Sequence, residues 1–405
     1  MTPDPFDLNL RHLRGAVAIV AQRSMNAAAR AVNLSQPALT QGLAKLERQL
    51  GVELFTRHAD GMIATPEGER LAARAAAALA CLGTAARGIA RGGSRGFARP
   101  DQLMTAAQTR AFVALADAGS FVGAGAATGL SQPAVHRAVR DLEQVSGTTL
   151  VERRGRGVAL TAAGQRLARG IRLAASEIAA GIAETRADRG ARSGRLVIGA
   201  MPLCRALLLP AALAELMREA PGASIDVLEG SRRELVEPLR DGVIDLMIGA
   251  LRPEIGADLV QRALFTDQLV VVGRAGHPLA MKRRASLGDL AAFPWVAGRA
   301  GTPLRALWTA LFDGHAQPPA PIDCGSVMVI RGILRDSDFL TLLSPAQVAM
   351  EVETGILAII DTPLTVPDRR IGVTTRSGWR PTPLQERFLD LLEIERAAIG
   401  LQETE

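Results

Sequence analysis

Leu34-Ser35-Gln36-Pro37-Ala38 recurs 96 residues later as Leu130-Ser131-Gln132-Pro133-Ala134. Around this pentapeptide, residues 24–71 align without a gap with residues 120–167, and 18 of the 48 aligned positions are identical. The offset is longer than the roughly 20–50 residues of a solenoid repeat. The chain therefore contains a duplicated domain.

Each copy has the residue pattern of a winged helix-turn-helix. In the first copy Ser35 can cap a helix, Pro37 stands in its first turn, and Gly51 can end it. Asp60-Gly61 predicts a two-residue hairpin, and Thr65 can cap the long helix that follows. Small residues that allow the two preceding helices to cross closely are Ala28, Ala31, Ala124 and Ala127.

The exposed face of the capped helix and the hairpin arginines are expected to contact DNA, because this helix enters the major groove in such domains. In the first copy the predicted DNA-binding residues are Ser35, Gln36, Pro37, Thr40, Gln41, Lys45 and Arg57. In the second copy they are Ser131, Gln132, Pro133, His136, Arg137, Arg140, Arg153, Arg154 and Arg156. The second copy has more basic side chains, so we expect it to bind DNA phosphates more strongly.

Charge is divided unequally along the 405 residues. Residues 1–194 hold 25 basic and 15 acidic side chains, whereas the rest of the chain holds 22 basic and 26 acidic ones. The basic half favours a polyanionic partner. The chain has no Tyr and only 3% aromatic residues, which argues against single-strand stacking and membrane anchoring. Double-stranded DNA is the predicted partner.

Other compositional features predict a reduced, cytoplasmic protein. Three cysteines are too few for a disulfide framework. The first residues lack the pattern of a signal peptide, and no stretch of about 20 apolar residues is present.

The acidic half alternates apolar runs with helical segments, which predicts a parallel sheet and two α/β lobes. Ligands of such folds bind beyond the carboxyl ends of the strands, where helix N-termini attract anions. The expected effector-binding residues are Met201, Pro202, Ser231, Ala250, Arg252, Gly298, Arg299, Gly301, Thr302, Ser326, Val327 and Ser344.

These patterns divide the chain into six predicted segments. They are winged domain 1 (residues 8–66), linker helix 1 (67–90), a flexible linker (91–100), winged domain 2 (101–162), linker helix 2 (163–190) and a two-lobed effector domain (195–405). Both linker helices have an apolar stripe, so we expect them to pack antiparallel within one chain. The alternative is that each helix pairs with its counterpart in a second chain.

Ser-Gln-Pro-Ala followed by Leu-Glu, Gly, a wing Arg and Thr-x-x-Gly resembles the DNA-binding domain of LysR-type transcriptional regulators. The first copy departs from that pattern at Gln41, where the second has Arg137. Glu229-Gly230-Ser231 and Ile244-Asp245-Leu246 resemble the effector domain of the same family, which has the two-lobed periplasmic-binding-protein fold of type 2. The stretches 199–202 and 324–332 are similar to the branch that contains the galactose-binding-protein regulator.

The resemblance implies a transcriptional regulator whose promoter binding responds to a small molecule between the lobes. It implies a sugar, an organic acid or an aromatic acid as the effector, contact with RNA polymerase, and a homo-oligomer, either dimer or tetramer. Neither a cofactor nor a metal ion is expected.

Three other functions are possible for a chain of this length and composition. An enzyme is disfavoured because the chain has no P-loop, nucleophile elbow or metal-binding motif, and its five histidines are scattered. A purely architectural DNA protein would not need the acidic α/β half. A thiol-based redox regulator using Cys204 and Cys324 is the sharpest alternative.

Overall fold

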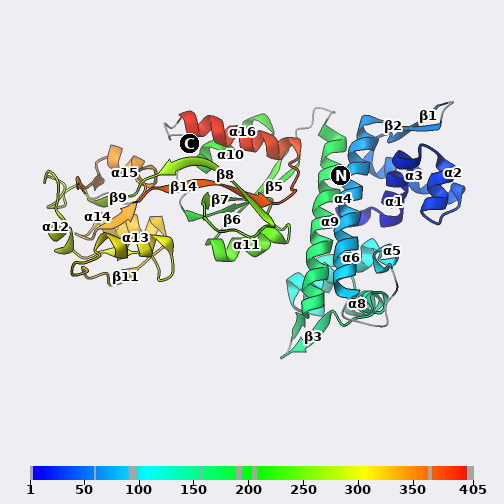
Figure 1. The fold of residues 1–405 in the computed structure, drawn as a ribbon, viewed down its shortest axis with the longest axis horizontal. Helices are drawn as coiled ribbons and strands as arrows, with labels where there is room; N and C mark the ends of the chain where they lie inside the picture. Colours follow the sequence, from blue (N-terminus) through cyan, green and yellow to red (C-terminus); the bar gives the residue numbers. More distant parts are fainter. Residues whose placement is uncertain are drawn as a thin grey trace.

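The computed structural model describes residues 3–58, 61–90, 97, 99–155, 157–187, 194–202, 208–363 and 367–398. An α-helical half with two small hairpins and an α/β half lie side by side along the long axis of the molecule (Figure 1). The predicted linkers on either side of the second copy fall mostly outside the described residues. Within the described residues, no helix is both long and apolar enough to cross a membrane.

The two copies fold into the same succession of elements. The first comprises α1 (Leu10–Gln22), α2 (Met25–Ala31), α3 (Gln36–Leu50), β1 (Phe55–His58), β2 (Gly61–Ala64) and α4 (Pro66–Ala90). The second comprises α6 (Ala106–Ala118), α7 (Phe121–Thr128), α8 (Gln132–Ser146), β3 (Val151–Arg154), β4 (Gly157–Leu160) and α9 (Ala162–Ala187). Each strand pair is an antiparallel hairpin, so both copies are winged helix-turn-helix domains.

The residues shared by the copies hold this fold together. Ser35 Oγ accepts a hydrogen bond from Ala38 N at 3.3 Å, and Ser131 caps α8 in the same way. Glu47 Oε1 accepts the backbone N–H of Leu54 at 2.9 Å, as Glu143 does for Leu150. Much of the repeated motif therefore stabilises the fold of each domain.

The close crossing of the first two helices uses fewer small residues than predicted. Ala28 and Ala124 are fully buried. Ala31 and Ala127 are exposed, so the expectation that they line the crossing is wrong. In α2 the buried residues are Ala28 and Ala29, and in α7 they are Ala124 and Gly125, so the buried part of each short helix ends before these positions.

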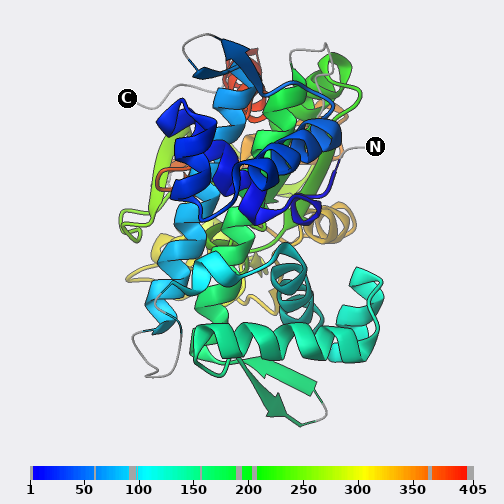
Figure 2. The ribbon, with the colours of Figure 1, turned by 90° about the vertical axis from the view of Figure 1, so that its right-hand side faces the viewer.

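Helices α4 and α9 pack against each other within one chain, as predicted, and run antiparallel. Gly170 near the start of α9 lies against Ala85 near the end of α4, whereas Gly181 lies against Arg74 near the start of α4. Both winged domains and this helix pair share one hydrophobic core. The two wings consequently lie at opposite ends of the pair (Figure 2).

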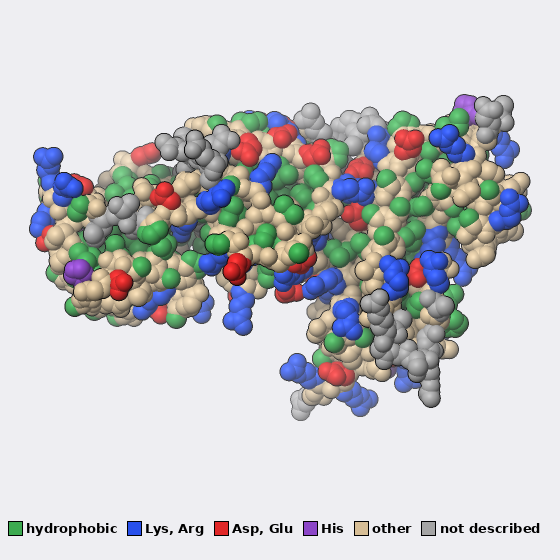
Figure 3. Space-filling view, viewed as in Figure 1, with side chains coloured by type: hydrophobic (Ala, Val, Ile, Leu, Met, Phe, Trp, Pro, Cys, Tyr) green, Lys and Arg blue, Asp and Glu red, His purple; other side chains and the backbone are tan. Residues whose placement is uncertain are grey.

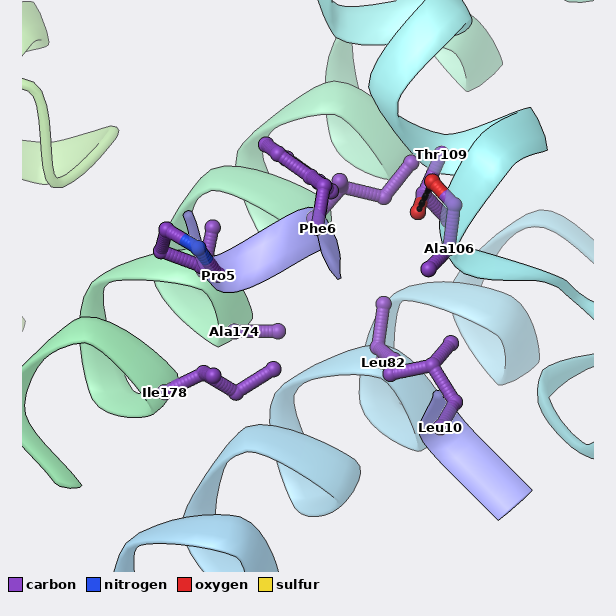
Figure 4. Close-up of a pocket in the computed structure, with 10 residues that line it drawn as sticks. Pro5, Phe6, Leu10, Leu82, Ala106, Thr109, Ala174 and Ile178 are labelled. Carbon is purple, nitrogen blue, oxygen red and sulfur yellow. Dashed lines mark hydrogen bonds between the residues drawn. The ribbon is translucent and has the colours of Figure 1, made fainter. Parts of the chain in front are cut away.

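The segment before each winged domain crosses to the other copy. The short helix η1 (Pro5–Asp7) inserts Phe6 among Thr109 of α6 and Ala174 and Ile178 of α9 (Figure 4). Its counterpart α5 (Pro100–Leu103) presents backbone carbonyls to Arg14 of α1.

The contacts of these two segments are reciprocal. Arg14 and Arg110 occupy equivalent positions in the 96-residue repeat, and Arg110 forms an ion pair with Asp7 at 3.6 Å. The two winged domains therefore form an intramolecular pseudo-dimer with reciprocal contacts.

Lobe 1 of the α/β half contains a five-stranded sheet in the order β6-β5-β7-β14-β8. Its elements are β5 (Arg195–Ala200), α10 (Leu208–Glu219), β6 (Ser224–Glu229), α11 (Arg232–Arg240), β7 (Leu246–Ala250), β8 (Leu259–Asp267), β14 (Arg369–Arg376) and α16 (Pro383–Ala398). β5 is parallel to β6 and β7, as predicted, but β14 is antiparallel to β7 and β8. The prediction of a parallel sheet is confirmed for these three strands, and the direction of β14 could not be read from its apolar run, which indicates burial alone.

Lobe 2 contains a three-stranded antiparallel sheet in the order β12-β9-β13 and a short parallel pair, β10 and β11. Its elements are β9 (Val270–Arg274), α12 (Leu287–Ala291), β10 (Val296–Ala297), α13 (Pro303–Leu311), β11 (Ile322–Asp323), α14 (Val327–Arg335), β12 (Thr341–Leu343), η3 (Pro345–Gln347), α15 (Ala349–Glu353) and β13 (Leu357–Ile359). Trp295, Trp308 and Phe312 form the aromatic centre of its core.

Lobe 1 rests directly on the helix pair that joins the winged domains. Arg169 Nε and Arg172 Nη1 of α9 donate to the two carboxylate oxygens of Asp241 at 2.7 and 3.0 Å. Gly242, with φ of +73°, is close enough that a Cβ there would lie 3.0 Å from the Leu173 side chain. The turn after α11 therefore packs directly against α9.

A second contact joins lobe 1 to α4. Arg74 of α4 is buried and donates to the backbone carbonyls of Arg380 and Pro381 at 3.0 and 3.2 Å. Its guanidinium also binds Glu177 and Glu184 of α9. Lobe 1 therefore contacts both linker helices.

Candidate DNA interface and effector cleft

The predicted base-reading residues of the second winged domain gather on one exposed face of α8. An open hollow of about 660 Å³ is lined by Gln132, Pro133, His136, Arg137, Arg140 and Asp141. Arg137 and Arg140 are exposed, and none of the hydrogen bonds or ion pairs among the described residues occupies their guanidinium groups. This surface can present two cations and an amide to base edges and phosphates.

His136 has a constraint that the sequence does not reveal. Its ring stacks on Phe121 of α7, with the ring centroids 4.0 Å apart and an angle of 15° between the planes. The stacking fixes the imidazole against its own domain and leaves the ring half-exposed.

The wing of the second domain is basic. Arg153 and Arg154 are exposed on β3, and basic side chains, drawn in blue, are visible around this hairpin (Figure 3). The third predicted wing residue, Arg156, lies outside the described residues.

The equivalent face of the first winged domain is less charged. Thr40 Oγ1 donates to the Gln36 carbonyl at 3.0 Å and accepts from Gln36 Nε2 at 3.3 Å, so these side chains are tied to their own helix. Gln41 and Lys45 are exposed, as is Arg57 on β1. Ser35 and Ser131, also predicted to bind DNA, are the N-caps of their helices, and Pro37 and Pro133 occupy the first turns.

The predicted effector-binding residues of lobe 1 lie at one edge of its sheet, because β5, β6 and β7 are parallel. They are Met201, Pro202, Ser231, Ala250 and Arg252. The side chain of Met201 packs on the backbone of β7. Ser231 caps α11, and its N–H and O–H both donate to Glu234 Oε2, at 2.8 and 2.7 Å.

In lobe 2, six of the seven predicted residues lie beyond β10 and β11: Gly298, Arg299, Gly301, Thr302, Ser326 and Val327. Thr302 caps α13 by accepting from Arg305 N at 3.3 Å, whereas Ser326 begins α14 with no side-chain capping bond. The seventh residue, Ser344, is buried and donates to Asp267 Oδ1. Asp267 also binds Arg369 at 2.6 Å, so Ser344 is part of the connection where β8 and β14 cross between the lobes.

The charge of one lobe 2 side chain acts on a carboxyl group of lobe 1. The pKa of the Glu234 carboxyl on α11 is lowered, first by its hydrogen bonds from Ser231 and then by the charges of Arg299 and Arg233. Arg299 belongs to lobe 2 and lies on the loop after β10. That the effector residues of the two lobes face each other stays a prediction.

Sequence reasoning missed Arg232, which directly follows Ser231. Its Nη1 atom is buried and has no hydrogen-bond partner. A lone arginine beside a helix cap has no sequence signal that separates it from an exposed surface residue.

Two further predictions concern metal ions and thiol chemistry. The described residues contain no group of three or more His, Cys, Asp or Glu side chains placed to hold a metal ion. Cys324 is a free, half-buried cysteine, and its predicted redox partner Cys204 lies outside the described residues.

Comparison with known families accounts for both halves of the chain. The model "LysR substrate binding domain" matches residues 189–396, and "Bacterial regulatory helix-turn-helix protein, lysR family" matches residues 10–69 and again 106–165. The chain belongs to the LysR family. It is accordingly a DNA-binding transcriptional regulator of that family with two winged domains and one effector-binding domain.

Individual relatives agree with this assignment. The HTH-type transcriptional regulator GalR of Pseudomonas putida is 33% identical over 380 residues, which cover 93% of this chain and 94% of that protein. PcaQ of Agrobacterium fabrum is 28% identical over 286 residues, covering 70% of this LysR-family chain and 92% of PcaQ.

Solved structures share the two-lobed fold. ArgP of Mycobacterium tuberculosis covers 74% of this chain and 98% of its own, with a TM-score of 0.57 and 20% identity. A full-length OxyR variant of Pseudomonas aeruginosa covers 72% of this chain and 97% of its own, with a TM-score of 0.53 and 23% identity. At this identity the likeness to OxyR shows the fold alone, so the thiol-based alternative is not favoured.

Proposed function

We propose that one chain of this regulator reads two successive major grooves as an intramolecular pseudo-dimer. The observation that carries this proposal is the antiparallel packing of α4 and α9 within a single chain. Successive major grooves on one side of a duplex are about 34 Å apart, and the winged domains lie at opposite ends of the helix pair. The two recognition helices differ in sequence, so the operator is asymmetric.

The predicted DNA-binding residues of α8 and the β3–β4 wing supply most of the affinity. Arg137, Arg140, Arg153 and Arg154 are all exposed, whereas the face of α3 offers Lys45 as its main cation. Neutralising phosphates with cations drives DNA binding, so the second half-site is the stronger one.

We further propose that an effector bound between the lobes modulates this binding through lobe 1. The contacts of Asp241 with α9 and of Arg74 with the backbone before α16 support this route. Ligand binding that changes the lobe positions would act on the linker helices at both contacts. The effector is a sugar, an organic acid or an aromatic acid.

The remaining parts of the proposal follow from the family. The chain acts in the cytoplasm as a homo-oligomer, a dimer or tetramer, contacts RNA polymerase at the promoter, and has no catalytic activity. The division into segments 8–66, 67–90, 91–100, 101–162, 163–190 and 195–405 remains a prediction.

Footprinting and stoichiometry test the pseudo-dimer together. The purified full chain is bound to its own upstream DNA, and the mass of the complex is measured by light scattering. We expect two adjacent protected major grooves per chain. One protected groove per chain would mean that each winged domain works with a domain of a second chain.

A further inference from the structure

Two arginines stand at the carboxyl ends of strands that flank the centre of lobe 1. Arg232 is the first residue of α11 and follows β6, and Arg252 is the second residue after β7. β6 and β7 lie on either side of β5 and are both parallel to it. Their carboxyl ends therefore share the edge of the sheet at which ligands of open α/β folds bind.

Arg232 is half-buried, and one of its guanidinium nitrogens is withdrawn from solvent without compensation. Its Nη1 is buried and makes no hydrogen bond, and among the described residues no acidic side chain forms an ion pair with it. Arg240, two turns further along the same helix, shows the usual arrangement, because Glu237 and Asp258 bind it at 2.8 and 2.7 Å. A buried charge is costly unless it is paired.

Arg252 adds to the free-energy cost of the unpaired charge on Arg232. Its one described contact is through the backbone, where its N–H donates to Gln261 Oε1 at 3.3 Å. The pKa of the Arg232 guanidinium is lowered, first by burial and then by the positive charges of Arg252 and Arg240. Like charges near a partly buried cation destabilise it, and an anion bound between them reverses the effect.

The position of this pair also contrasts with the charge of its domain. Residues 195–405 contain 22 basic and 26 acidic side chains, yet two arginines without acidic partners stand at one edge of the sheet. The positive charge of Arg299 in lobe 2 also contributes to the lowered pKa of Glu234 at the same end of α11, after the hydrogen bonds from Ser231. A cluster of one sign in a cleft attracts a ligand of the opposite sign.

We propose that Arg232 and Arg252 bind the acid group of the effector, so that the effector is a small organic anion and not a neutral sugar. The proposal rests on the effector cleft of the proposed function and adds the chemical class of its ligand. A carboxylate accepts charge-assisted hydrogen bonds from guanidinium groups, often in bidentate geometry. Closure of the lobes brings the positive charge of Arg299 toward the same anion.

Ligand binding to the full chain tests this. Acetate, succinate, benzoate and sulfate are titrated in parallel with acetamide, succinamide and benzamide, and the unfolding temperature is followed. We expect at least one anion to raise the unfolding temperature and its neutral amide to have no effect. The Arg232→Gln and Arg252→Gln variants should weaken that anion by roughly 10- to 100-fold.

Arg233→Gln is the matched control, because Arg233 is the exposed neighbour of Arg232 on the same helix. The Arg233→Gln variant should bind the anion with an affinity within about twofold of the native chain. Sulfate also raises the unfolding temperature of proteins in general, and this effect is the same in the native chain and in the variants, so the comparison removes it. Equal binding of the acids and their amides would overturn the proposal. It would also be overturned if every anion bound to Arg232→Gln as tightly as to the native chain.

The footprint on the upstream DNA, recorded with each compound, separates this proposal from the proposed function. A neutral sugar that changes the footprint would agree with regulation by an effector, as proposed above, and would overturn the anion site.

Discussion

Arg172 of α9 and Asp241 of lobe 1 form an ion pair, with Nη1 and Oδ2 3.0 Å apart. The same guanidinium reaches Asp117 of α6 through Nη2 at 2.5 Å. Arg172 therefore bridges the effector domain and the second winged domain. Its side chain is only 17% exposed, so the bridge is partly shielded from solvent, unlike an ordinary surface ion pair.

We predict that Arg172→Ala uncouples effector binding from DNA binding. The variant should bind the effector with unchanged affinity, because Arg172 is remote from the strand ends, while the effect of the effector on DNA affinity is reduced. The contact of Arg74 with lobe 1 remains in this variant, so part of the effect is retained. Isothermal titration with and without operator DNA measures both quantities.

A double-mutant cycle with Asp241→Ala provides the control. A coupling energy of about 0.5–3 kcal/mol between the two positions would show that the bridge itself carries the effect. Additive losses would assign it to other contacts of α9.

The two winged domains are predicted to contribute unequally. Arg137→Ala should cost about 1–3 kcal/mol of specific DNA binding, because an exposed arginine on a recognition helix can contact a base edge in bidentate fashion. Gln41→Ala, at the equivalent position of α3, should cost clearly less. Gel-shift titrations at one fixed salt concentration compare them, and equal losses would contradict the asymmetry.

Much of the winged half could be predicted because its information is local. Ser35, Glu47 and their counterparts act within about seven residues along the chain, so the repeated motif shows both their identity and their role. The contact between Arg172 and Asp241 joins residues 69 positions apart, and no local pattern indicates which acid an arginine meets.

The effector half could be predicted less well for a related reason. Strand β8 lies at the edge of its sheet and pairs with β14, whose residues follow it by 102 to 117 positions along the chain, so no local pattern indicates its partner. Ser344 was expected to bind the effector from its place after a strand, whereas its hydroxyl is used by Asp267. A strand-end position predicts the right edge of a sheet but not the direction of a side chain.

Lobe 2 is predicted to lose stability as the pH falls. Buried His277 accepts the Leu279 N–H at Nδ1 (3.1 Å), with Nε2 3.2 Å from the Asp338 carbonyl, which fits the neutral ring. Its pKa is lowered from 6.5, mainly by burial. The unfolded chain therefore binds the proton more readily, and stability present above pH 6.5 is lost as the pH falls from there through the lowered folded pKa.

Urea unfolding at pH 7.5 and 5.5 measures this dependence. His277→Gln, which keeps an amide for hydrogen bonding without titrating, should reduce the difference between the two pH values. The exposed His315→Gln serves as the control and should leave it unchanged. An unchanged difference in His277→Gln would assign the pH dependence to other groups.

The intramolecular pairing of α4 and α9 is tested by two glycines with opposite surroundings. A side chain at Gly170 would collide with Ala85 and with the Cys81 backbone carbonyl, whereas Gly88 has nothing within 4 Å of an added Cβ. Gly170→Leu should therefore destabilise the full chain by about 1–3 kcal/mol. Gly88→Ala should stabilise it by up to about 1 kcal/mol through helix propensity.

Because the pairing lies within one chain, Gly170→Leu should lower the unfolding temperature while the mass measured by light scattering stays the same. A lower mass for Gly170→Leu, with no change for Gly88→Ala, would show that the two helices pair between chains.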